Sequence, residues 1–148
     1  MRTMIRIFLF IAVCSMSAYG FQSDNKAGTK TPAQVAQALV DAYNAHDLEA
    51  ILRTYHPNSV AKRLPGGEPF LNGHADIRKK FAGAFQRSAK LTVEVTQRIV
   101  DGDFVIDKEK ITGVTNGKPF ERYGVVIYEI REGLIVNEWY PQSRPVSK

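Results

Sequence analysis

The chain has 148 residues, which is enough for one domain and too few for two ordinary ones. Hydrophobic residues make up 44% and charged residues 24%, a balance typical of a soluble globular protein. The formal net charge is +5, but the basic residues are scattered, and the one tight cluster, residues 78–80, lies beside apolar Ile77 and Phe81 in a predicted helix. This distribution argues against nucleic acid as a partner, because nucleic-acid binding requires a basic stripe or patch.

The first 20 residues, MRTMIRIFLFIAVCSMSAYG, have the three parts of a secretory signal peptide. Arg2 and Arg6 give a positive start, residues 7–13 form a short apolar core, and residues 18–20 place small residues where signal peptidase reads them. We expect cleavage after residue 20. The mature domain would then be periplasmic or secreted, with no membrane attachment once the signal peptide is removed.

Two other interpretations of this segment stay open. It could remain as an uncleaved membrane anchor, although its apolar core is shorter than the ~20 residues that span a bilayer. It could also be a lipoprotein signal that uses Cys14, although the bulky Val13 precedes that cysteine. If cleavage follows residue 20, the only cysteine leaves with the signal, which excludes a disulfide framework and a thiolate nucleophile in the mature chain.

Residues 21–31 are polar and predict a flexible tether, which makes 32–142 the folded domain and 143–148 a C-terminal tail. Three predicted helices follow the tether. Thr31 and Pro32 begin the first of them, as cap and first helical residue.

The second predicted helix is capped by Asp47, and its apolar face ends with Tyr55 just before Pro57. A short strand at 60–64 and a turn-rich loop, PGGEPFLNG, come next. The third helix runs from about His74 to Arg87.

From Leu91 onward the pattern changes to the alternation of β-strands, punctuated by the hairpin turn signals VDGD and TNGK and by the turn REGL. The later strands are predicted at 103–113, 120–130 and 135–140. Helices followed by an antiparallel meander predict an α+β domain, in which the helices cover the hollow side of a curved sheet. Such a cone is a natural pocket for a small molecule.

Three stretches carry a resemblance: AYNAHDLEAILRTYHPNSV, GGEPFLNGHADIRKKF and EGLIVNEWYP. With the strand meander, they resemble the nuclear transport factor 2-like superfamily, in its SnoaL-like and steroid delta-isomerase-like branch, over about residues 33–140. The resemblance implies a cystatin-like, cone-shaped barrel of three N-terminal helices packed on a curved antiparallel sheet. It also implies an open cavity and a homodimer formed through the outer face of the sheet.

The ketosteroid isomerases of this superfamily use a Tyr on the first helix, an Asp base after the second and an Asp acid on the third long strand. The corresponding positions here fall on Leu39, near Arg63 and near Val126. The resemblance therefore does not imply ketosteroid isomerisation by that machinery. The superfamily also hosts cyclases, dehydratases, hydrolases and binding domains, so its fold does not fix a function.

Asp107 and Glu109 are the catalytic candidates. They lie two residues apart in one predicted strand, so their side chains share a face, and the family overlay turns that face toward the cavity, together with Tyr128. Burial and mutual repulsion would raise the pKa of at least one carboxyl, which supplies a general acid and a general base together. In the alternative, both acids are solvated and pair with Arg122 or Lys118 on the neighbouring strand.

Four residues are candidates for ligand binding: Tyr55, Arg63, Tyr128 and Trp139. The Arg63 guanidinium could bind a ligand carboxylate, and the tyrosines could donate their hydroxyls. The alternatives are a core position for Tyr55, a surface position for Arg63, and packing in the core or a dimer face for Trp139.

The three histidines, His46, His56 and His74, lack metal-ligand spacing, and the sequence has no phosphate-binding or dinucleotide motif. We therefore expect neither a metal nor a cofactor. The sequence predicts an exported domain that binds a small, partly apolar organic ligand, with cofactor-free isomerase-like or cyclase-like acid/base chemistry as one hypothesis. The other hypothesis is a non-catalytic periplasmic ligand-binding or dimerisation domain.

Overall fold

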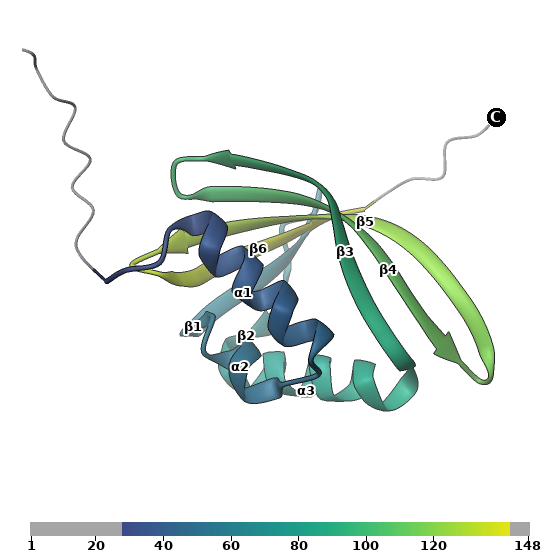
Figure 1. The fold of residues 1–148 in the computed structure, drawn as a ribbon. Coiled ribbons are helices and arrows are strands. Elements are labelled where there is room, and N and C mark those ends of the chain that lie inside the picture. The colour runs from purple at the N-terminus through teal and green to yellow at the C-terminus, as the bar shows by residue number, and fades with distance from the viewer. Residues whose placement is uncertain (1–27, 143–148) are drawn as a thin grey trace, which may run out of the picture.

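The computed structural model describes residues 28–142 as three helices packed on a curved, six-stranded sheet (Figure 1). In chain order the elements are α1 (Pro32–Asn44), α2 (Leu48–Leu52), β1 (Tyr55–Leu64), β2 (Pro69–Asn72), α3 (Gly73–Arg87), β3 (Ala89–Asp101), β4 (Phe104–Thr115), β5 (Lys118–Arg131) and β6 (Leu134–Pro141). The strand order is β2-β1-β6-β5-β4-β3. This is the predicted α+β architecture. The predicted signal peptide, most of the tether and the C-terminal tail lie outside the described residues.

The first two helices begin where the sequence predicts. The Thr31 hydroxyl accepts the N–H of Gln34 at 3.3 Å, and the Gln34 side chain accepts the N–H of Thr31 at 2.9 Å. This reciprocal capping box satisfies backbone donors that a helix start leaves free. Asp47 caps α2 with a single bond, because its carboxylate accepts the N–H of Ala50 at 2.8 Å.

Helix α2 is shorter than predicted, because Thr54 turns the chain into the sheet. The Thr54 hydroxyl donates to the carbonyl of Ile51 at 2.7 Å, and its own carbonyl accepts the N–H of Ile135 at 2.8 Å. Tyr55 is therefore the first residue of β1 rather than the last apolar residue of a helix.

The sheet is mixed, not wholly antiparallel as predicted. Strand β1 runs parallel to β6, from Tyr55 beside Ile135 to Leu64 beside Pro141. Strand β2 forms in the segment predicted to be a loop and pairs antiparallel with β1. Both differences come from pairing between distant or irregular segments, which the periodicity of a single strand does not specify. Within the described residues, no helix is long and apolar enough to cross a membrane.

A β-bulge at Thr96 decides which side chains of β3 face the helices. The register with β4 shifts by one residue between Val95 and Gln97. Before the bulge the odd-numbered residues of β3 point toward the helices, and after it the even-numbered residues take that direction. Arg98 consequently lies opposite Asp107 on the helix-facing side of the hairpin.

All three helices lie against one face of the sheet (Figure 1), and their buried apolar side chains pack there. The core formed there comprises Val35, Ala36, Leu39, Ala42, Ile51, Leu52, Tyr55, Ile77, Phe81, Val105, Val126, Tyr128, Ile130 and Ile135. On the opposite face of the sheet, four large apolar or aromatic side chains are exposed: Ile99, Phe104, Tyr123 and Val125. The sheet therefore has one buried face and one face rich in uncovered apolar surface.

Candidate active site

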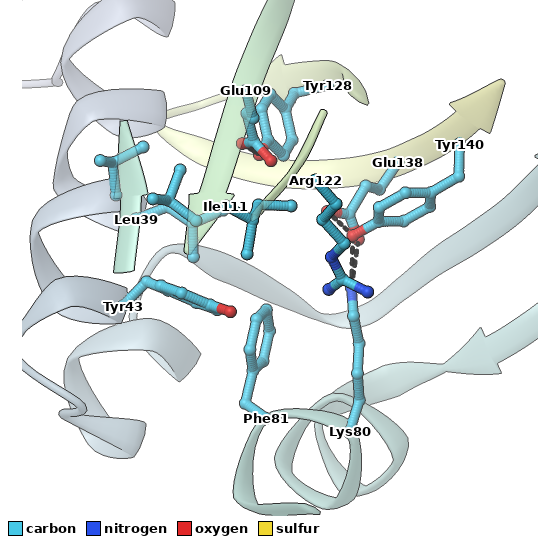
Figure 2. A pocket seen from close by; sticks show the side chains of 12 residues that line it. Leu39, Tyr43, Lys80, Phe81, Glu109, Ile111, Arg122, Tyr128, Glu138 and Tyr140 are labelled. Carbon is cyan, nitrogen blue, oxygen red and sulfur yellow. Dashed lines mark hydrogen bonds and ion pairs between the residues drawn. The ribbon is translucent and has the colours of Figure 1, made fainter. Parts of the chain in front are cut away.

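A cavity of about 100 Å³ lies between the helices and the inner face of the sheet (Figure 2). It is lined by Leu39, Val40, Tyr43, Lys80, Phe81, Val93, Glu109, Ile111, Arg122, Tyr128, Glu138 and Tyr140. Most of this wall is apolar or aromatic, with a few polar groups converging on it, as in small-molecule sites. The volume is enough for several water molecules or for part of an organic ligand.

Glu109, on β4, is a carboxyl group of this cavity with altered acidity. Its pKa is raised to about 7, first by burial and then by the negative charges of Glu138 and Asp107. The Tyr128 hydroxyl opposes this by donating a hydrogen bond to the Glu109 carboxylate at 3.3 Å. A carboxyl group with this pKa exists in both forms near neutral pH, so it can accept and return a proton.

Glu138, on β6, is a second acid in the same wall, with 3% of its surface exposed. Its Oε1 accepts hydrogen bonds from the hydroxyls of Tyr55, at 3.2 Å, and Tyr140. Its Oε2 is buried without a hydrogen-bond partner in the described structure, and the nearest cation, Lys80 Nζ, is 3.7 Å away (Figure 2). Because a buried polar atom normally has a partner, this oxygen is a ready acceptor for a donor on a ligand.

Three tyrosines of the cavity remain neutral hydrogen-bond donors at physiological pH. Burial raises the pKa of Tyr43 to about 12 and the pKa values of Tyr128 and Tyr140 well above their ordinary value. The Tyr43 hydroxyl points into the cavity from α1 (Figure 2). The Tyr128 and Tyr140 hydroxyls already donate to Glu109 and Glu138. The Tyr43 hydroxyl is therefore the one of the three that can donate to a carbonyl or enolate oxygen of a ligand.

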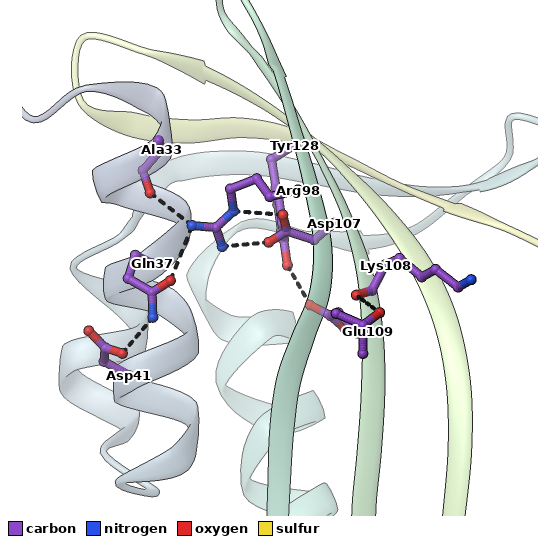
Figure 3. A network of polar contacts seen from close by, with 9 residues as sticks. Ala33, Gln37, Asp41, Arg98, Asp107, Lys108, Glu109 and Tyr128 are labelled. Carbon is purple, nitrogen blue, oxygen red and sulfur yellow. Dashed lines mark hydrogen bonds and ion pairs between the residues drawn. The ribbon is translucent and has the colours of Figure 1, made fainter.

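Asp107 shares the inner face of β4 with Glu109 but is not among the residues that line the cavity. Its fully buried carboxylate accepts two hydrogen bonds of 2.7 Å from the Arg98 guanidinium. Arg98 also donates to the carbonyl of Ala33, at 3.3 Å, and to the side chain of Gln37, at 3.1 Å (Figure 3). The predicted pair is thus divided: one acid is held in an ion pair that fastens the sheet to α1, and the other lies in the cavity.

The four predicted ligand-binding residues occupy different surroundings. Tyr128 lines the cavity, whereas Tyr55 lies in the core and reaches Glu138 from outside it. Arg63 is exposed and lies over the ring of Phe70, 4.4 Å from its centre.

Trp139 does not line the cavity. It lies on the opposite face of β6 from Glu138 and Tyr140 and packs near Phe104, with ring centres 6.3 Å apart. The alternation of the strand explains this: because Glu138 faces the helices, Tyr140 must also face them and Trp139 must face away. Tyr140 therefore takes the position predicted for Trp139.

Several residues of the site were missed by sequence reasoning, chiefly Arg98, Glu138 and Lys80. The hairpin turn could have identified Arg98. The turn at residues 102–103 places Asp101 opposite Phe104, and three further pairs along the hairpin Arg98 lies opposite Asp107. No comparable count joins Lys80 to Glu138, because they lie on a helix and a strand 58 positions apart in the chain.

The histidines serve the backbone or the core. His46 and His74 each lie within 2.9 Å of a backbone carbonyl, those of Leu91 and Tyr55, and the His46 ring stacks on Phe85. Among residues 28–142, no group of three or more His, Cys, Asp or Glu side chains is arranged to hold a metal ion.

Comparison with solved structures shows the fold. A hypothetical protein with a ketosteroid isomerase-like fold from Catenulispora acidiphila, in complex with trimethylamine, superposes with a TM-score of 0.65 at 17% identity, covering 76% of this chain and 88% of the other. IdmH, a putative polyketide cyclase from Streptomyces antibioticus, superposes with a TM-score of 0.67 at 20% identity, covering 75% of this chain and 91% of IdmH. A cystatin-fold protein of Novosphingobium aromaticivorans superposes with a TM-score of 0.67 at 20% identity, covering 76% of this chain and 99% of the other.

Comparison by sequence identifies the family. No curated protein matches the chain significantly. The family model of the SnoaL-like domain, in contrast, matches residues 36–138, which is most of the folded part. The cone-like packing of three helices on the curved sheet and the cavity between them agree with this match. The chain belongs to the SnoaL-like domain family of the nuclear transport factor 2-like superfamily.

Proposed function

We propose that this protein is an exported, cofactor-independent acid/base enzyme that moves a proton next to a carbonyl group of a small, partly apolar organic compound. The observation that carries the proposal is Glu109, a carboxyl group in the cavity wall with a pKa of about 7. The name of IdmH, a putative polyketide cyclase with the same fold, fits chemistry of this kind. The signal-like N-terminal sequence supports export.

In the proposed reaction, the Glu109 carboxylate accepts a proton from the carbon beside the ligand carbonyl. The C–H bond breaks, and its electron pair moves to the carbonyl oxygen, which becomes an enolate oxygen. The Tyr43 hydroxyl, directed into the cavity, donates a hydrogen bond to that oxygen. Return of the proton to another carbon gives isomerisation. Attack of the enolate on a second carbonyl, followed by proton return to the new alkoxide, gives cyclisation.

Asp107 has a positioning role in this proposal. Its ion pair with Arg98 holds β3, β4 and α1 together, and its negative charge helps to raise the pKa of Glu109. It does not touch the cavity and transfers no proton.

The test of the function uses the bicyclic ketone 2-tetralone as a probe, with protein that lacks residues 1–20. In D₂O near neutral pH, we expect the protein to exchange the hydrogens beside the carbonyl for deuterium faster than buffer alone, as measured by mass spectrometry. Binding of 2-tetralone without faster exchange would instead favour a non-catalytic ligand-binding domain. The unpartnered Oε2 of Glu138 would then serve to bind a ligand donor.

Replacing Tyr128 with Phe is expected to raise the pKa of Glu109 above its value of about 7. The Tyr128 hydroxyl donates to the Glu109 carboxylate, and this bond favours the ionised form. Carbon-detected NMR titration of the Glu109 carboxyl group measures the change. Tyr123→Phe is the matched control, because Tyr123 is exposed and donates to Glu121. An unchanged or lower pKa in Tyr128→Phe would contradict the assigned hydrogen bond.

We also propose a homodimer formed through the outer face of the sheet, because Ile99, Phe104, Tyr123 and Val125 leave apolar surface exposed there. Native mass spectrometry is expected to show two subunits for the wild type and one for Val125→Arg. Val100→Arg is the control, since Val100 is also exposed but belongs to the opposite face of the hairpin. A wild type that is monomeric at micromolar concentration would refute the dimer.

The proposed export is tested by the mass of the subunit in protein purified from a cell that exports it. This mass reports whether residues 1–20 have been removed.

A further inference from the structure

Outside the cavity lies a cleft of about 390 Å³. It is lined by Tyr43, Arg63, Phe70, Lys80, Phe81, Ala84, Arg87, Arg122 and Tyr140. Five of these residues also line the cavity, namely Tyr43, Lys80, Phe81, Arg122 and Tyr140. The cleft and the cavity are therefore neighbouring parts of one site, with the aromatic rings of Tyr43, Phe81 and Tyr140 at their junction.

The cleft is strongly cationic. Arg63 on β1, Arg87 on α3 and Arg122 on β5 come from three separate elements and meet there with Lys80. None of the described lining residues of the cleft is acidic. Such a set of guanidinium groups, converging from distant segments on one hollow, fits the planar oxygens of a carboxylate.

These three arginines differ from most others of the described chain in having no acidic partner. Arg78, Arg98 and Arg131 each form a salt bridge with a carboxylate. Within residues 28–142, no salt bridge engages the arginines of the cleft, and Arg63 instead lies over the Phe70 ring. The guanidinium groups of the cleft are thus available to an anion from solution.

The cavity, at the inner end of the site, adds two acids to the Lys80 and Arg122 that line both parts. Glu109 and Glu138 present carboxylate oxygens there, and the Oε2 atom of Glu138 is buried without a hydrogen-bond donor. Leu39, Ile111 and Phe81 supply an apolar wall beside them. A ligand that fits both ends carries a hydrogen-bond donor or an acidic C–H group at one end, an apolar body, and an anion at the other.

We infer that the ligand is an organic acid, whose carboxylate lies in the cleft among Arg63, Arg87 and Arg122 while its carbonyl or enol end lies against Glu109 and Glu138. This inference rests on the proposed function for the position of the reactive end. To the proposed function it adds that the substrate is an organic acid and that the three arginines select its carboxylate. The arginines act in binding and orientation, and they hold the reactive carbon at the inner acid.

The test compares two probes of the same shape, 6-hydroxy-2-naphthoate and 6-hydroxy-2-naphthamide, by isothermal titration calorimetry on protein lacking residues 1–20. We expect the carboxylate to bind at least about tenfold more tightly than the amide, equivalent to about 1.4 kcal/mol. The double variant Arg63→Gln/Arg122→Gln is expected to remove this preference and to leave the affinity for the amide nearly unchanged. Higher salt concentrations should reduce the preference in the wild type.

Arg53→Gln is the matched control for the loss of positive charge. Arg53 is exposed at the end of α2 and does not line the cleft, so its replacement should keep the carboxylate preference. Equal affinities of the wild type for the two probes would overturn the inference, as would no binding of the naphthoate at millimolar concentration. Loss of the preference in Arg53→Gln would also overturn it, because the attraction would then be a general effect of net charge.

The outcomes separate this inference from the proposed function. Glu109→Gln leaves the arginines intact and should retain the preference for the carboxylate. A retained preference, together with a lack of deuterium exchange in 2-tetralone, would mean that the protein binds organic acids without catalysis. Exchange without a carboxylate preference would mean that the acid/base chemistry is correct and the assigned substrate class is wrong.

Discussion

Glu109→Gln is expected to lower the rate of deuterium exchange in 2-tetralone by a factor of about 10²–10⁴, the usual contribution of a positioned general base. Glutamine keeps the size of the side chain but cannot accept the proton. In the wild type, the rate should rise with pH and level off above about 7, as Glu109 becomes ionised. Mass spectrometry of the probe at several pH values measures both effects.

The same substitution should stabilise the fold at alkaline pH. Because burial and the charges of Glu138 and Asp107 raise the pKa of Glu109 from the ordinary 4.5 to about 7, the folded protein loses stability as pH rises through that interval. Glu109→Gln removes this loss. The variant should therefore exceed the wild type by about 2–3 kcal/mol in free energy of unfolding at pH 8, with a much smaller difference near pH 4. Urea denaturation at the two pH values provides the measurement.

Glu121→Gln is the control, because Glu121 is exposed and pairs with Lys110 on the sheet. It should change neither the exchange rate nor the dependence of stability on pH by a comparable amount. Full exchange activity in Glu109→Gln would remove Glu109 from the mechanism. Lost activity without any gain in stability at pH 8 would mean that the Glu109 carboxyl group is better solvated than its surroundings indicate.

Arg98→Met is expected to lower the free energy of unfolding by about 3–5 kcal/mol, as is usual when one partner of a buried ion pair is removed. Asp107 is fully buried, and both of its carboxylate oxygens accept bonds from Arg98. Without the guanidinium, that carboxylate must stay charged in an apolar setting or take up a proton. The variant also loses the hydrogen bonds from β3 to Ala33 and Gln37 on α1. Urea denaturation at pH 7 measures the loss.

The double variant Arg98→Met/Asp107→Leu distinguishes the ion pair from simple packing. Since it leaves no unpaired charge, it should recover most of the stability lost in Arg98→Met. It should also retain measurable exchange of 2-tetralone if Asp107 only positions the sheet. If the double variant folds but does not exchange 2-tetralone, and Glu109→Gln does exchange it, the general base would be Asp107 and not Glu109.

The local signals of the sequence were sufficient for the elements that flank the site. The capping residues Thr31 and Asp47 fixed the starts of two helices, because a cap acts within three residues of itself. The alternation in β4 put Asp107 and Glu109 on one face, and the structure has both on the helix-facing side. Turn residues such as Asn116–Gly117 fixed the hairpins, because only certain residues adopt their backbone conformation readily.

What the sequence by itself determined is therefore the family, the α+β class, the hairpins and the placement of Asp107 and Glu109 on one face of a strand. The tertiary structure decided the parallel pairing of β1 with β6 and the ion pair between Lys80 and Glu138. It also decided that Asp107 pairs with Arg98 while Glu109 lines the cavity. The physical reason is the range of the interactions. Caps, turns and alternation act between near neighbours in the chain, whereas the acidity of Glu109 depends on burial and charges that distant segments bring to it.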